Sequence, residues 1–164
     1  MTGTGKTSLA KQLSNQALNS GKKSYYLTPD ANMDLDFPCT YRTIDKEAFL
    51  KFMFESRGHI FFIDESRETV GPHAKEMTKT ATRTRHLNHT VCFIGQRSQM
   101  IDTNVREQCE VICAFNQSKK NGVILADTYG DDLFKEVNSL PVGTFIYRLS
   151  AGIPAQKVIL FSKT

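Results

Sequence analysis

The residues whose chemistry is easiest to interpret stand near the start of the chain, in Gly3-Thr4-Gly5-Lys6-Thr7. A glycine-rich turn followed by Lys and Thr is most of the phosphate-binding loop G-x-x-x-x-G-K-[ST], here without its leading glycine. Backbone N–H groups of such a loop form an anion nest at a helix N-terminus. Lys6 is then expected to reach the β- and γ-phosphates, and the Thr7 hydroxyl to ligate Mg²⁺. The predicted nucleotide-binding residues are Thr2, Gly3, Thr4, Gly5, Lys6, Thr7 and Ser8.

An apolar run that ends in two acids, from His59 to Glu65, supplies a second motif of the Walker B type. Such a run is typical of a parallel strand covered on both faces, and acids just beyond its carboxyl end lie where open α/β sheets bind ligands. Asp64 would hold Mg²⁺, and Glu65 would orient or deprotonate the attacking water. Either motif alone could be an ordinary turn. Together they predict a nucleotide-hydrolysing protein that uses ATP and Mg²⁺.

A third polar position follows the expected strand Thr90–Gly95, which ends in Gln96-Arg97-Ser98. A polar side chain at the tip of a strand beside the Walker B strand can touch the γ-phosphate or its attacking water. Gln96 is therefore predicted to act as a catalytic sensor, although Gln-Arg after a strand is by itself an ordinary start of a loop.

Strands and helices alternate along the sequence, which predicts an α/β fold with a mostly parallel sheet flanked by helices. One helix is expected from Ser8 to Ser20, with Gly21 ending it and with an apolar face of Leu9, Leu13, Ala17 and Leu18. A second, capped by Asp45, is expected to run to about Ser56 and to bury Phe49, Phe52 and Met53.

Further helices are expected over 72–86 and 131–139, and further strands over 23–28, 41–44 and 110–115. The segments 143–149 and 156–161 alternate well enough to predict an antiparallel hairpin at a sheet edge. A phosphate-binding loop needs a strand before it, and the sequence offers none. The expectation is a single domain over 1–164 that lacks its first strand.

Composition limits the classes of partner and cofactor that the chain is expected to have. The chain has 164 residues, 40% of them hydrophobic, and a formal net charge of +4, which permits nucleic-acid contact without requiring it. No stretch approaches the ~18 apolar residues of a membrane span. Cys109 and Cys113 lack a second pair or histidine partners at zinc spacing, so no metal site is predicted there.

In these motifs the chain resembles the FtsK–HerA superfamily of P-loop DNA-pumping ATPases. The superfamily's strand after Walker B ends in a sensor glutamine, which Gly95-Gln96-Arg97-Ser98 matches with serine where proline is usual. An arginine often stands eleven residues before that glutamine, as Arg85 does here. The stretch 140–147 (LPVGTFIY) is similar to the superfamily's L-x-x-G-x-x-h-Y ending. The likeness is greatest to the small genome-packaging ATPases of tailless membrane-containing viruses.

This resemblance implies a RecA/FtsK-like core and an ATPase that translocates double-stranded DNA through backbone contacts, with packaging of a viral genome as the expected task. It also implies that the chain assembles into a ring, with six subunits expected. Contacts with capsid or membrane vertex proteins are expected as well, and so is a location in the host cytoplasm or the virion. A neighbouring subunit usually supplies an arginine to the site. The candidates are Arg83, Arg85, Arg97 and Arg106, with Arg85 and Arg106 favoured.

Three alternatives remain open from the sequence. A conjugation or phage-extrusion ATPase would carry the same motifs. A small-molecule kinase would need an arginine-rich lid, and the region after Gln96 has few arginines. A non-enzymatic module could keep the fold without turnover. The pair Lys119-Lys120 replaces an arginine of the superfamily and is interpreted either as a loop facing a DNA pore or as a surface turn.

Overall fold

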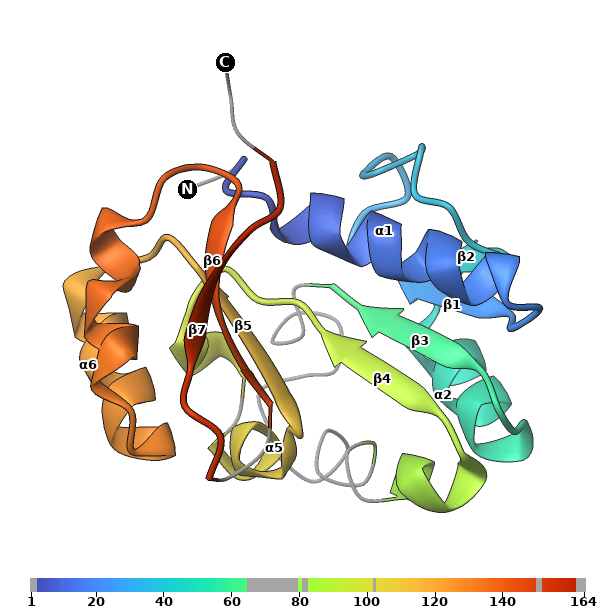
Figure 1. Ribbon diagram of the computed structural model, residues 1–164. Helices are drawn as coiled ribbons and strands as arrows, with labels where there is room; N and C mark the ends of the chain where they lie inside the picture. The colour runs from blue at the N-terminus through green and yellow to red at the C-terminus, as the bar shows by residue number, and fades with distance from the viewer. Residues whose placement is uncertain (1–2, 65–79, 81–82, 102, 150–151, 162–164) are drawn as a thin grey trace.

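The computed structural model describes residues 3–64, 80, 83–101, 103–149 and 152–161. Within them lie two sheets (Figure 1). The parallel sheet has the order β2-β1-β3-β4, from the strands β1 (Ser24–Leu27), β2 (Tyr41–Thr43), β3 (Ile60–Ile63) and β4 (Thr90–Phe93). The antiparallel sheet has the order β5-β6-β7, from β5 (Val111–Phe115), β6 (Thr144–Leu149) and β7 (Gln156–Ile159). These sheets and their helices confirm the predicted α/β fold.

Among the described residues, helices cover both faces of the parallel sheet. Side chains alternate along a strand, so Tyr26 and Phe62 share the face of α1 (Lys6–Asn19), with Ala10 and Ala17 packed on them. Tyr25 and Phe61 point to the opposite face, where they pack under α2 (Lys46–Glu55). All four residues of β3 are buried, which accounts for its unbroken apolar run.

The caps of both helices agree with the sequence. The Asp45 carboxylate accepts a 3.0 Å hydrogen bond from the Ala48 N–H and so begins α2. Gly21 has φ +80 just after α1, and the N–H of Lys22 returns to the Ala17 carbonyl at 2.9 Å.

The predicted buried faces of these helices need correction. The residues of α1 that are buried are Ala10, Ser14 and Ala17, whereas Leu13 is 38% exposed. Small side chains let α1 approach the sheet closely, close enough for the Ser14 and Ser24 hydroxyls to lie 2.6 Å apart. On α2, Phe49 and Met53 are buried as predicted, but Phe52 is 40% exposed.

The antiparallel sheet packs against α6 (Lys119–Tyr129) and the 3₁₀ helix η3 (Asp132–Ser139). The predicted hairpin is confirmed as β6 and β7. Strand β5 lies near its predicted place but pairs antiparallel with β6, so among described strands it is outside the parallel sheet. The helix α6 was not predicted, and Lys119 and Lys120 form its first turn where a loop was expected.

The remaining described elements are short. They are η1 (Thr84–Leu87), η2 (Ser98–Met100) and α5 (Thr103–Gln108). Most of the helix predicted over 72–86 lies outside the described residues. None of the helices in the described ranges combines the length and the apolar character that a membrane crossing requires.

Candidate nucleotide-binding site

The glycine loop is held open at the start of α1 by two left-handed residues. Gly3 has φ +86 and Gly5 has φ +110, a region that L side chains rarely adopt. Gly5 also has a close neighbour, because an added Cβ would lie 3.0 Å from the Phe115 ring at the end of β5, which would have to move by a few tenths of an ångström. Thr2 lies outside the described residues, whereas Thr7 and Ser8 stand in the first turn of α1.

The Lys6 side chain turns back over this loop. Its ammonium donates a 3.2 Å hydrogen bond to the Thr4 hydroxyl. Burial lowers the pKa of Lys6, and the nearby Asp64 carboxylate opposes that shift. The two groups that the sequence assigned to phosphate and to Mg²⁺ are therefore close enough to interact, although they come from α1 and from the end of β3.

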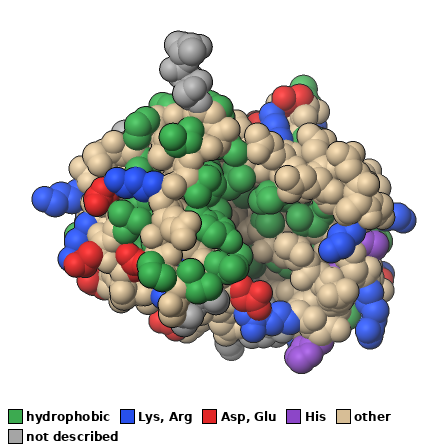
Figure 2. Space-filling view, viewed as in Figure 1, with side chains coloured by type: hydrophobic (Ala, Val, Ile, Leu, Met, Phe, Trp, Pro, Cys, Tyr) green, Lys and Arg blue, Asp and Glu red, His purple; other side chains and the backbone are tan. Residues whose placement is uncertain are grey.

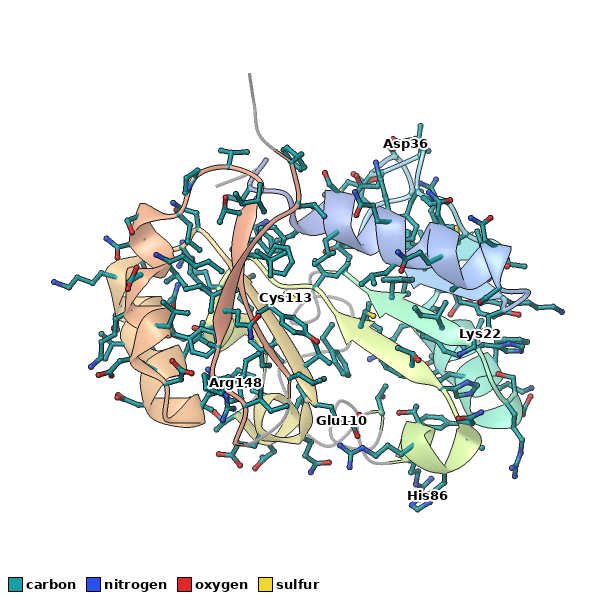
Figure 3. All side chains as sticks on the ribbon, viewed as in Figure 1. Lys22, Asp36, His86, Glu110, Cys113 and Arg148 are labelled. Atoms are coloured by element: carbon teal, nitrogen blue, oxygen red, sulfur yellow. The ribbon has the colours of Figure 1, made fainter. Side chains whose placement is uncertain are left out.

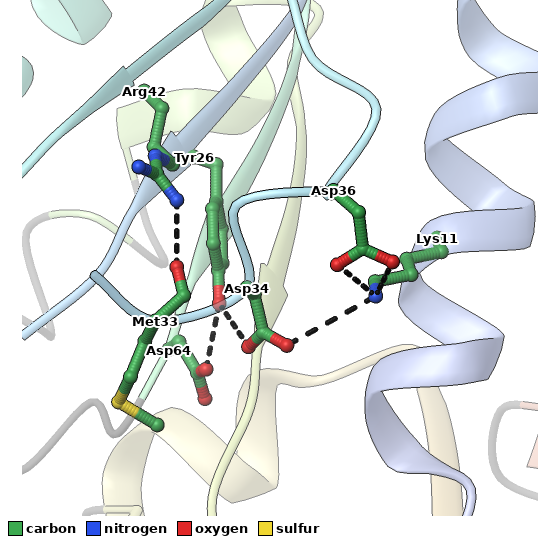
Figure 4. Close-up of polar contacts among 7 residues, drawn as sticks. All are labelled: Lys11, Tyr26, Met33, Asp34, Asp36, Arg42 and Asp64. Atoms are coloured by element: carbon green, nitrogen blue, oxygen red, sulfur yellow. Dashed lines mark hydrogen bonds and ion pairs between the residues drawn. The ribbon is translucent and has the colours of Figure 1, made fainter. Parts of the chain in front are cut away.

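Asp64 is only 6% exposed, and Tyr26 in the neighbouring strand holds it. The Tyr26 hydroxyl lies 2.8 Å from Asp64 Oδ2 and 3.1 Å from Asp34 Oδ2 (Figure 4). Burial raises the pKa of Tyr26, and both carboxylates raise it further. Tyr26 therefore stays a neutral donor next to the carboxylate that was predicted to bind the metal.

Sequence reasoning missed this part of the site. The loop after β1 brings Asp34, with φ +46, next to Tyr26. Lys11 on α1 ties the same loop down through a 2.7 Å contact with Asp36 and a 4.0 Å contact with Asp34 (Figure 4). The available signal was the acidic character of 34–36, but nothing in the sequence pairs that loop with β3.

Gln96 follows β4 and lines the same cavity as Lys6. The parallel register of β3 and β4 pairs Ile63 with Phe93. This brings the residues that follow the two strands to one edge of the sheet. Glu65, the predicted base, lies outside the described residues.

The C-terminal hairpin meets the loop as well. The Gly143 N–H donates a 3.1 Å hydrogen bond to the Thr4 carbonyl, and the Gly143 carbonyl accepts one of 2.7 Å from the Leu160 N–H. Gly143 has φ +80, and a Cβ there would run into the backbone of Phe161. The Pro-x-Gly turn of the 140–147 stretch thus holds the glycine loop through the backbone of Thr4.

The model of the family "Zonular occludens toxin (Zot)" matches residues 11–150. The chain belongs to the Zot family. No curated protein matches it in sequence.

Solved structures resemble this Zot-family chain in fold. The genome packaging NTPase B204 from Sulfolobus turreted icosahedral virus 2, in complex with AMPPCP, gives a TM-score of 0.77 at 12% identity, with 95% of this chain and 92% of that chain covered. B204 of Sulfolobus turreted icosahedral virus, described as a DNA-packaging ATPase, gives 0.75 at 13%, with coverage of 98% and 94%. The N-terminal domain of zonular occludens toxin from Neisseria meningitidis gives 0.56 at 15%, with coverage of 98% and 91%. The expected likeness to small viral packaging ATPases is thereby confirmed as one of fold.

The two favoured arginines of the Zot-family chain lie away from its own loop. Arg85 is exposed and pairs at 3.1 Å with Glu110, which stands just before β5, at the end of the molecule far from the start of α1 (Figure 3). Arg106 is 7% exposed and donates to the Thr103 hydroxyl at 2.9 Å. A buried guanidinium does not suit an arginine that must reach a neighbouring subunit, so Arg85 is the better candidate.

Proposed function

We propose that the chain is an ATPase that couples hydrolysis to movement along double-stranded DNA, as a viral genome-packaging motor does. The observation that carries the proposal is that Lys6, at the glycine loop, lies close enough to the Asp64 carboxylate to interact with it, while Gln96 lines the same cavity as Lys6. Transfer of a γ-phosphoryl group to water needs positive charge, a carboxylate and a neutral hydrogen-bonding group. The likeness of fold to B204, solved with AMPPCP and with ATP-gammaS, supports this assignment.

Each residue has a separate role in this mechanism. The N–H groups of Gly3 to Gly5 would hold phosphate oxygens, and the Lys6 ammonium would neutralise charge on the β- and γ-phosphates. Glu65 would take the proton of the attacking water, and Gln96 would orient that water against the γ-phosphate. Tyr26, by its hydrogen bond to Asp64, would keep that carboxylate in one orientation.

The residues at the site also fit Mg²⁺. The Thr7 hydroxyl and the Asp64 carboxylate are hard oxygen donors, which Mg²⁺ prefers. When bound, the ion would supply positive charge that offsets the negative charge developing on the phosphate oxygens. Thr7 and Asp64 would hold the ion, and the hydrogen bond from Tyr26 would orient Asp64.

For DNA, the first turn of α6 offers two exposed cations. Lys119 and Lys120 follow the end of β5, whose Phe115 lies beside Gly5, so they stand at the same edge as the nucleotide loop. Flexible cations of this kind bind phosphates without reading sequence. We propose that in a ring of six subunits they face the DNA, with Arg85 completing a neighbour's site.

The test is steady-state ATP hydrolysis with and without double-stranded DNA, in the chain and in its Glu65→Gln variant. Stimulation by DNA that Glu65→Gln abolishes would support the motor. Turnover that ignores DNA but needs a small acceptor molecule would replace it with a kinase. No turnover, with nucleotide still bound, would leave a binding module.

The DNA contact has a matched control. Replacing Lys119 and Lys120 together with Ala should remove most of the stimulation by DNA and lower the salt dependence of DNA binding by about two phosphate contacts. Lys22 and Lys23, exposed between α1 and β1, carry the same charge at a distant place, where Figure 3 labels Lys22. Their double replacement should leave stimulation intact. Equal losses in both pairs would mean that only net charge matters.

Movement of DNA outward rather than into a capsid would reassign the motor as an extrusion ATPase.

A further inference from the structure

Three side chains, Tyr26, Asp34 and Lys11, form a polar connection from the end of β3 back to helix α1 (Figure 4). The Tyr26 hydroxyl lies within hydrogen-bond distance of both Asp64 and Asp34, and the other carboxylate oxygen of Asp34 lies 4.0 Å from the Lys11 ammonium. Lys11 stands one turn after Thr7 on the same face of α1. The two elements that carry Thr7 and Asp64 are therefore linked by a route of side chains that needs no metal ion.

The loop that carries Asp34 is anchored on both sides of this residue. Before it, the Arg42 guanidinium of β2 donates hydrogen bonds of 2.6 and 2.7 Å to the carbonyl oxygens of Met33 and Ala31. After it, the Phe37 N–H donates to the Asp34 carbonyl at 2.9 Å. The Asp34 carboxylate is thus held in place before any ligand binds.

The backbone of Asp34 also indicates that its position is constrained. Its φ is +46, and among the described residues other than glycine only Asn88 also has a positive φ. Such a conformation is uncommon even for Asp. It persists only where the surrounding structure fixes it, and it is found often at functional sites.

Lys11 lies between two acids with different surroundings. Asp36, 2.7 Å away, is 79% exposed, and Figure 2 shows red and blue side chains together at the surface where Figure 3 labels Asp36. Asp34 is 24% exposed, so water screens its interaction with Lys11 less. The contact with Asp34 continues to Tyr26 and the end of β3, which makes Asp36 a matched control outside the connection.

We propose that Asp34 and Lys11 are positioning residues that fix the spacing between Thr7 and Asp64 and so make the site selective for Mg²⁺ over Ca²⁺. This inference rests on the proposed function, which assigns the ion to those two side chains. Mg²⁺ requires oxygen ligands at about 2.0–2.1 Å in near-ideal octahedral geometry, whereas Ca²⁺ accepts longer distances and variable geometry. Because the smaller ion tolerates less change in spacing, a rigid link between α1 and the end of β3 favours it.

The experiment measures this selectivity without hydrolysis. AMPPCP is titrated into the chain in excess Mg²⁺ or in excess Ca²⁺, and the ratio of the two dissociation constants is compared among variants. Asp34→Asn and Lys11→Met interrupt the polar connection, whereas Lys11→Arg keeps its charge. Asp36→Asn makes the same change of charge outside it. Urea titration of each variant separates a loss of selectivity from a loss of fold.

Asp34→Asn and Lys11→Met should weaken binding in Mg²⁺ by about tenfold, because groups that hold a metal ligand contribute that much to metal affinity. Binding in Ca²⁺ should weaken much less, so the ratio falls. Lys11→Arg and Asp36→Asn should keep the ratio of the parent.

An unchanged ratio in Asp34→Asn, or an equal fall in Asp36→Asn, would overturn the proposal and leave the proposed function standing. A parent chain that binds AMPPCP with neither ion would contradict the proposed function, and this proposal with it.

Discussion

The hydroxyl of Tyr26 lies between two carboxylates, 2.8 Å from Asp64 and 3.1 Å from Asp34. The two carboxylates share the single proton of this hydroxyl as a hydrogen-bond donor. Lys11, 4.0 Å from Asp34, adds positive charge on the outer side. The same ring stacks on Phe37 with centroids 4.0 Å apart. Tyr26 thus connects the core of the sheet to the polar site at its edge.

Tyr26→Phe keeps this stacking and removes only the hydroxyl. Hydrogen bonds to charged groups contribute about 1.5–3 kcal/mol, so the free energy of unfolding should fall by about that amount in urea titrations at neutral pH. The dependence of hydrolysis on Mg²⁺ should shift to higher concentration, because Asp64 loses the donor that orients it. Tyr25→Phe removes the same atom from the opposite face of β1 and should leave the Mg²⁺ dependence unchanged. A common shift in both variants would contradict the role given to Tyr26.

Lys6→Met should stabilise the fold while abolishing nucleotide binding. Burial lowers the pKa of Lys6 below its ordinary 10.5, so the folded chain binds this proton more weakly than the unfolded chain does. The resulting cost is fully present below the lowered pKa, and it disappears as pH rises from there toward 10.5. The variant should melt above the parent at pH 7, with the difference shrinking toward pH 10.5. Lys22→Met, at an exposed lysine, is the control, and a constant difference across pH would sink the idea.

Gly5→Ala tests the geometry of the loop. The substitution forces a side chain to φ +110 and places its Cβ 3.0 Å from the Phe115 ring, so nucleotide affinity should fall at least tenfold in equilibrium titrations. Gly58 has φ +75 with open space around it, which makes Gly58→Ala a control for strain without contact. That variant should lose about 1–2 kcal/mol of stability but bind nucleotide as the parent does.

Arg85→Ala separates a role in a neighbour's site from a structural role. The Arg85–Glu110 pair is exposed, with side chains 56% and 70% accessible, and such pairs contribute less than about 1 kcal/mol. The free energy of unfolding should therefore change little in Arg85→Ala and in Glu110→Ala. Hydrolysis per subunit should fall only in Arg85→Ala, and mixing that variant with Lys6→Met should restore part of it. Equal activity in the two single variants would remove Arg85 from the proposal.

Local patterns were enough to predict many of the elements. The Asp45 cap, the end of α1 at Gly21 and the apolar strand before Asp64 each depend on neighbours a few residues away, and all three are found as expected. The exposed Leu13 was not predictable in this way. A helical period shows which residues are apolar but not which of them a sheet will cover.

The sequence by itself determined which chemistry to predict, because Gly5, Lys6 and Thr7 would bind phosphate through one turn of backbone, and their residue types are enough to predict that role. Only the tertiary structure decided what surrounds that turn. Tyr26 reaches Asp64 across 38 residues of chain, and Gly143 reaches Thr4 from the C-terminal hairpin. Such contacts depend on strand order and on the packing of the hairpin against α1. Strand order and hairpin packing are properties of the whole fold. They depend on many residues together, so no single residue in the sequence predicts these contacts.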